Sequence, residues 1–159
     1  LEGMLKELNR VKLWAGLLPI KGPGIVVTLD DSKRKIKAGE DLENYIIHDY
    51  DLREVVNELW TSGAEAIAIN DQRIVVSSEI RCVGSTVLVN GVRLAPPYMV
   101  KAIGDADSLI NALTMPGGII SALNYISKDF GIIIKIDKKD LLELPPYEGS
   151  ITLKYGRSE

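Results

Sequence analysis

Residues 51–69 read DLREVVNELWTSGAEAIAI and combine the patterns of a helix, its C-terminal end and a short strand. Apolar side chains recur at helical spacing from Leu52 to Leu59, and Gly63 is the kind of residue that ends a helix. The alanine and isoleucine run that follows, residues 64–69, predicts a short strand directly after the helix. Because a second apolar strand, IVVTL at 25–29, precedes this helix, the segment predicts a β-α-β unit.

A second unit of the same kind follows. YMVKAI at 98–103 has a strand pattern, and residues 105–126 have helical spacing that Pro116-Gly117-Gly118 interrupts. GIIIKI at 131–136 is strongly apolar, which predicts a central strand. Two successive β-α-β units predict an α+β fold of the ferredoxin-like, split β-α-β kind.

Strands and turns fill the stretch between the two units. Asn90-Gly91 between β-branched runs is a strong hairpin signal, and Pro96-Pro97 ends the ladder. We therefore expect Arg73–Leu94 to form an inserted β-hairpin or an extension of the sheet. The tail contains one further candidate edge strand, Ile151–Tyr155.

Residues 1–18 have the pattern of the end of an amphipathic helix. Their apolar positions alternate in steps of three and four: Leu1, Met4, Leu8, Val11, Ala15 and Leu18. Such a stripe is either a coiled-coil seam or the face of a helix packed on its own domain, and both interpretations remain open. We divide the chain into this helix at 1–18 and a single α+β domain at 22–159. Because the pattern is already under way at Leu1, we also expect an upstream segment that could carry a membrane anchor.

Composition argues against several functions. The chain has 159 residues, a formal net charge of −3 and a pI of about 5.3, so it lacks the basic footprint of a nucleic-acid-binding protein. No run reaches the roughly 18 apolar residues of a membrane span. The basic run Lys33–Lys37 lies beside acidic residues and is either a solvated loop or a contact for phosphate or lipid.

Candidate chemistry is sparse. The single histidine, His48, and the single cysteine, Cys82, do not fit the usual zinc patterns, and we predict no metal, no cofactor and no catalytic residue. Cys82 lies in an alternating run and is expected to be buried. Asp49 and Asp51 suit helix capping, and Gly117-Gly118 either breaks a helix or holds an anion at its start. We therefore expect that the protein is not an enzyme.

Polar side chains crowd the region of the predicted hairpin. They form either a specific binding face or the solvent-facing half of alternating strands. The residues of this predicted face are His48, Asn70, Arg73, Ser78, Glu79, Arg81 and Arg93.

Several segments resemble the YlxW/YlxX family of Gram-positive bacteria, the domain of unknown function DUF881. The resemblance extends from about Gly22 to Gly149 and rests on nine stretches: Gly22–Asp31, Tyr45–Asp49, Val55–Leu59, Gly63–Asn70, Gln72–Ile74, Ser77–Cys82, Val89–Tyr98, Lys101–Asp105 and Met115–Gly118. It implies an N-terminal membrane anchor, a coiled-coil stretch and a domain outside the cytoplasmic membrane. Members are loosely called division initiation proteins, and no activity, cofactor or catalytic residue of the family can be carried over.

The residues and the resemblance together lead to a functional expectation. We expect a non-enzymatic extracytoplasmic domain of a membrane-anchored protein, which serves as an interaction or scaffold module linked to cell division or the envelope. Its expected partners are an envelope or division protein and a second copy bound through the N-terminal helix. The alternative is a domain that binds or senses a small ligand, such as an anion, a nucleotide or a wall fragment.

Overall fold

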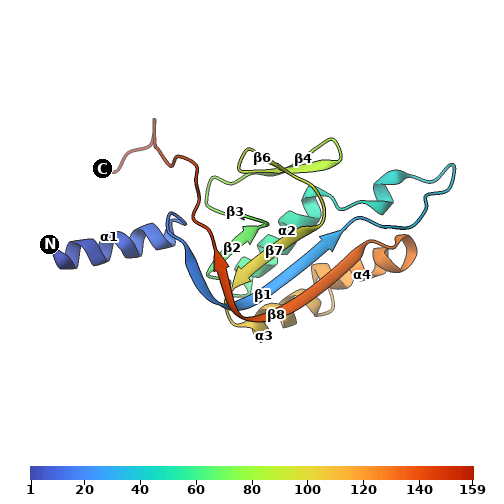
Figure 1. Ribbon diagram of the computed structural model, residues 1–159, viewed down its shortest axis with the longest axis horizontal. Coiled ribbons are helices and arrows are strands. Elements are labelled where there is room, and N and C mark those ends of the chain that lie inside the picture. The colour runs from blue at the N-terminus through green and yellow to red at the C-terminus, as the bar shows by residue number, and fades with distance from the viewer.

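The computed structural model describes residues 1–159 and combines helices with two antiparallel sheets (Figure 1). The helices are α1 (Glu2–Trp14), α2 (Asp49–Thr61), α3 (Ala106–Thr114) and α4 (Ile119–Phe130), with a short 3₁₀ turn at Leu42–Tyr45. The strands are β1 (Ile20–Asp30), β2 (Ala66–Ile69), β3 (Gln72–Arg73), β4 (Ile80–Val83), β5 (Thr86–Val89), β6 (Val92–Leu94), β7 (Tyr98–Ile103) and β8 (Ile133–Leu144).

The main sheet has the strand order β3-β2-β7-β1-β8, and all its neighbouring strands are antiparallel. β7 lies between β1 and β2, and β8 lies on the other side of β1, so the two β-α-β units interleave. The predicted α+β class is confirmed, whereas the narrower ferredoxin-like description stays a prediction.

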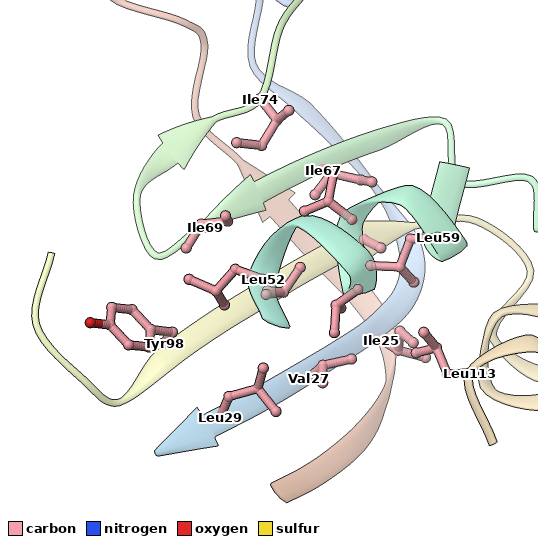
Figure 2. Close-up of a cluster of buried hydrophobic side chains, with 14 of the residues drawn as sticks. Ile25, Val27, Leu29, Leu52, Leu59, Ile67, Ile69, Ile74, Tyr98 and Leu113 are labelled. Carbon is pink, nitrogen blue, oxygen red and sulfur yellow. The ribbon is translucent and has the colours of Figure 1, made fainter. Parts of the chain in front are cut away.

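The core lies between one face of this sheet and helices α2, α3 and α4. Ile25, Val27 and Leu29 alternate along β1 and point into the core, where Ile25 lies beside Leu113 of α3 and where Leu52 and Leu59 of α2 are also buried (Figure 2). Full burial of such a side chain stabilises the fold by about 1.5–3 kcal/mol. The pattern of β-branched and aliphatic residues therefore fixes which face of β1 meets the helices.

β1 begins earlier than its sequence predicts. The Gly22-Pro23-Gly24 segment precedes the strand predicted at 25–29, but it lies inside β1, where the pairing with β8 shifts register. A Cβ atom at Gly24 would lie 1.8 Å from the carbonyl oxygen of Ala102. The glycine is therefore needed because β1 and β7 approach closely here, not because the chain turns.

The stretch between the two units is more than one hairpin. β3 extends the main sheet, while β4, β5 and β6 form a separate three-stranded sheet, which we call the insert sheet. The expected turn at Asn90-Gly91 joins β5 to β6, and both residues have positive φ angles, 53° and 74°, as a type I′ turn requires. The hairpin prediction is confirmed at this turn.

Two strand predictions near the C-terminus are wrong. β8 is the edge strand of the main sheet rather than a central one, and it runs on to Leu144. Only alternate residues such as Ile134 and Ile136 pack toward the core, while the exposed Lys135 between them protects the edge. The tail Ile151–Tyr155 forms no strand.

Helix α1 projects away from the domain (Figure 1). It has no buried side chain, and it ends at Trp14, before Gly16 adopts a positive φ of 78°. Packing along its own domain, one of the two interpretations of residues 1–18, is therefore wrong for this helix. No single helix has the length and apolar composition of a membrane span, whereas α3 and α4, bent by 56°, meet those criteria only as a pair.

Candidate functional site

Arg73 belongs to the interior rather than to a binding face. Its side chain is buried, and Nη1 donates hydrogen bonds to the carbonyl oxygens of Leu18 (3.0 Å) and Pro145 (3.1 Å). Burial lowers the pKa of the guanidinium. The residue thus ties the segment that enters β1 to the segment that leaves β8, and this role removes it from the predicted face.

Three other residues of the predicted face hold turns. The Asn70 side-chain oxygen accepts from the Met99 N–H at 2.8 Å, and the Ser78 hydroxyl accepts from the Val75 N–H at 2.9 Å. Glu79 accepts from the N–H of the glycine in the β5–β6 turn. Because these polar atoms are already bonded within the chain, their abundance reflects the number of tight turns in this region.

His48 lies at the start of α2. Its N–H donates to the Asp51 carboxylate at 2.8 Å, and its ring nitrogen Nε2 lies 2.7 Å from the Glu43 carbonyl oxygen. The ring also stacks on Tyr50 at a centroid distance of 4.8 Å. These are the contacts of a residue that shapes a helix entrance, and none of them joins His48 to the other residues of the predicted face.

Arg81 and Arg93 remain as the exposed, unpaired part of the predicted face. Both pair in register with Leu88, which lies on the middle strand between them, so the three side chains form one row on the same side of the insert sheet. Both arginines are exposed, and neither guanidinium has a hydrogen-bond or ion-pair partner in the chain. Since neighbouring strands are about 4.8 Å apart, the two arginine backbones are separated by about 10 Å. We call Arg81, Leu88 and Arg93 the two-arginine row.

The opposite side of the insert sheet fixes this orientation. Val87, Val89 and Leu94 alternate with the row and are buried in the main core. Because side chains of a strand point alternately to opposite faces, burial of these three residues forces Arg81 and Arg93 outward. Leu88, which is half-buried, was missed as a site residue because a leucine in a strand pattern does not reveal which face of the sheet it occupies.

A small polar network fastens the insert sheet to α2. Asp49 Oδ2 accepts from the Cys82 N–H at 2.9 Å and pairs with Arg53 Nη1 at 2.8 Å. The same Arg53 nitrogen donates to the Ile80 carbonyl oxygen at 2.7 Å. Partial burial would raise the pKa of Asp49, but the Cys82 N–H and the Arg53 guanidinium together hold it below its ordinary value.

Cys82 is exposed, so the expectation that it is buried is wrong. It belongs to an edge strand of the insert sheet, where its sulfur accepts from the Asp49 N–H at 3.3 Å instead of packing into the core. Desolvation beside α2 is the main cause that raises the pKa of the thiol, which is therefore protonated near neutral pH.

The glycine turn before α4 already holds an anionic group. Both carboxylate oxygens of Glu58 accept from the Ile119 N–H, at 2.9 and 3.1 Å. This contact from α2 satisfies the first free donor of α4. Of the two interpretations of Gly117-Gly118, the structure supports the helix break, with the anion supplied by the protein itself.

No group of three or more histidine, cysteine, aspartate or glutamate side chains is arranged to hold a metal ion.

Two buried side-chain oxygen atoms, Asn90 Oδ1 and Tyr98 Oη, have no hydrogen-bond partner in the chain. The Tyr98 hydroxyl has no hydrogen-bond partner in the chain, and burial is the main cause that raises its pKa to about 12. The only strongly shifted group is therefore a phenol that stays neutral.

This geometry defines an α+β domain that carries a separate, outward-facing insert sheet. The chain belongs to the family described as bacterial protein of unknown function (DUF881), whose family model matches residues 7–157. The resemblance to the YlxW/YlxX family is thereby confirmed.

Relatives from two genera illustrate the family. The chain is 40% identical to the UPF0749 protein YlxW of Bacillus subtilis (strain 168) over 121 residues, which are 76% of this chain and 52% of YlxW. It is 32% identical to the UPF0749 protein Rv1823 of Mycobacterium tuberculosis (strain ATCC 25618 / H37Rv) over 152 residues, 89% of this chain and 48% of that protein. The chain thus spans about half the length of these relatives.

A solved structure has a similar fold. It is described as the crystal structure of an uncharacterized conserved protein from Mycobacterium tuberculosis, and its sequence is 26% identical to this chain. The two structures superpose with a TM-score of 0.73, over 96% of this chain and 99% of the other.

Proposed function

We propose that this chain is a non-enzymatic interaction module of a membrane-anchored protein and that the two-arginine row of its insert sheet binds an acidic surface of an envelope or division protein. The observation that carries the proposal is the row itself, two unpaired guanidinium groups that flank an aliphatic side chain on one strand face. Arginine is enriched at the centres of protein interfaces because it combines charge with a flat, weakly hydrated group.

The contacts of the reactive side chains support a non-enzymatic role. His48 bonds to the backbone of the helix entrance, Asp49 holds the insert sheet, and the Cys82 thiol stays protonated. Burial is the main cause that raises the pKa of the Cys82 thiol, and the neighbouring Asp49 carboxylate raises it further, so this pair does not generate a reactive thiolate.

The location of the domain is part of the same proposal. We infer an anchor upstream of α1 and a domain on the outer side of the cytoplasmic membrane, because the family resemblance implies this layout. Helix α1 has no buried side chain in the monomer, so it can bury its apolar stripe against an identical helix. This supports a second copy of the chain as a further partner.

The alternative is a small anionic ligand, such as a nucleotide or a wall fragment, held by Arg81 and Arg93. The shape of the surface favours a protein instead, because neither arginine lines any of the cavities in the molecule. Small ligands bind in concave sites that bury most of their surface, whereas a flat strand face suits a macromolecule. A thermal shift with nucleotides or wall fragments that disappears in Arg81→Gln would favour this alternative.

A charge-matched comparison tests the main proposal. The full-length protein carries either Arg81→Gln with Arg93→Gln or, as a control, Lys35→Gln with Lys37→Gln, which removes the same charge from an exposed loop. After crosslinking in cells, the wild-type and control proteins should recover the same envelope protein, and the arginine variant should lose it. Equal recovery by all three proteins would refute the role of the two-arginine row.

A further inference from the structure

A groove separate from the two-arginine row runs along α2. Two adjoining cavities, of about 290 and 220 Å³, share Trp60 and Ile74, so they form one continuous depression. Trp14 at the end of α1 lines the first cavity, and Val56 and Ile80 line the second. The only two tryptophans of the chain therefore lie at this surface, which we call the two-tryptophan groove.

The C-terminal tail already reaches the groove. Ile151 is one of the residues that line the first cavity. Upstream of it, the Tyr147 N–H donates to the Gly16 carbonyl oxygen at 2.7 Å, and Arg73 bonds to the carbonyl oxygens of Leu18 and Pro145. The tail and the segment after α1 are thus held side by side before the tail meets the groove.

The remainder of the tail has the pattern of a groove ligand. Ile151, Leu153 and Tyr155 alternate with polar residues, and Leu153 and Tyr155 are 80% and 84% exposed. In an extended segment alternate side chains point the same way, about 6.6 Å apart. The tail bends at Lys154–Tyr155 in this structure, and an extended path along α2 in place of that bend would carry Leu153 from Ile151 toward the second cavity.

We infer that residues 150–155 form a strap that closes over the two-tryptophan groove, with Leu153 covering Trp60. The occupant is the tail of the same chain, because Ile151, although 40% exposed, already lines the first cavity and the next residues are covalently attached to it. Since Trp14 belongs to α1, closure also fixes the direction in which α1 leaves the domain. A helix that has no buried side chain of its own gains a defined orientation in this way.

Tryptophan fluorescence tests the strap directly. In a Trp14→Phe background Trp60 is the only tryptophan, and its quenching by acrylamide measures how far solvent reaches the groove. The proteins compared are the parent, Leu153→Ser, Lys154→Ser as the matched control on the opposite side of the tail, and a chain that ends at Gly149. Circular dichroism and thermal unfolding check that all four fold.

The inference predicts that the quenching constant of Trp60 rises by roughly two-fold in Leu153→Ser and in the shortened chain, because the ring loses its apolar cover, and that Lys154→Ser leaves it unchanged. Equal quenching in all four proteins would overturn the inference. Protection that grows with protein concentration would also overturn it, because the tail of a second copy would then be the occupant. The strap does not depend on the proposed partner of the two-arginine row, so either claim can fail alone.

Discussion

At the scale of single residues, arginine has two different roles in neighbouring parts of this chain. Arg73 is buried and bonds to two carbonyl oxygens from opposite ends of the domain, whereas Arg81 is exposed and unpaired. The sequence does not distinguish them, because both lie in short polar stretches next to strands.

Replacement by methionine should separate the two roles. In Arg73→Met the carbonyl oxygens of Leu18 and Pro145 lose their donor, so we expect the free energy of unfolding to fall by about 2–4 kcal/mol. Arg81→Met, the control, should change it by no more than about 0.5 kcal/mol, as for other exposed sites. Urea unfolding measures both values, and an equal effect of the two substitutions would contradict the assignment.

Gly24 is a second residue whose role is set by one contact. Its missing Cβ leaves room for the Ala102 carbonyl oxygen, 1.8 Å from where that carbon would lie. Gly24→Ala should therefore push β1 and β7 apart and reduce the free energy of unfolding by more than about 3 kcal/mol. Gly3→Ala, in the open on α1, should be neutral or stabilising. Comparable thermal unfolding of the two variants would show that the close approach is absent.

At the scale of elements, the attachment of the insert sheet to α2 depends on one carboxylate. Asp49 accepts from the Cys82 N–H and pairs with Arg53, and these contacts hold its pKa below the ordinary value. A depressed pKa in the folded state means that the carboxylate stabilises the fold above its unfolded pKa, near 3.9. That contribution is lost as the pH falls through the lower, folded pKa.

Asp49→Asn should therefore destabilise the protein by about 1–2 kcal/mol at pH 7. The difference from the wild type should shrink as the pH falls below about 4, because the wild-type carboxylate then becomes protonated as well. Urea unfolding at a series of pH values measures the trend. Asp107→Asn is the control, since its exposed pair with Lys138 contributes little. A difference that does not depend on pH would contradict the role of the charge.

The helices and strands differ in how well the sequence predicts them. The β-α-β units are predictable because their helices have clear spacing and glycine stops, and the Asn90-Gly91 turn is predictable because both residues tolerate positive φ. The edge position of β8 cannot be predicted, because an apolar run such as Ile132–Ile134 has the same pattern in an edge strand and in a central strand. Within the predicted face, Arg81 and Arg93 are exposed and unpaired, whereas the partners of Arg73 and Glu79 depend on contacts distant in sequence.

At the scale of the whole molecule, α1 offers a surface that the monomer does not use. Leu1, Met4, Leu8 and Val11 are all exposed on a helix that projects from the domain (Figure 1). If this seam pairs with a second copy, Leu8→Glu should raise the dimer dissociation constant by roughly ten-fold or more, because it places a charge in the apolar interface. Asn9→Glu, outside the seam, is the control.

Sedimentation equilibrium over a range of concentrations measures this constant. A wild-type chain that stays monomeric throughout, or equal constants for the two variants, would contradict self-association through α1. The result would leave the two-arginine row unaffected, since that row lies on the insert sheet and not on the helix.

We infer that the outer face of the insert sheet is a protein-binding surface. Its most direct test is a photo-crosslinking amino acid at Leu88, between the two arginines, in the full-length protein in cells. We predict an adduct with one envelope or division protein, which disappears when Arg81 and Arg93 are both replaced by glutamine. No adduct from position 88, or the same adduct without the two arginines, would contradict the account.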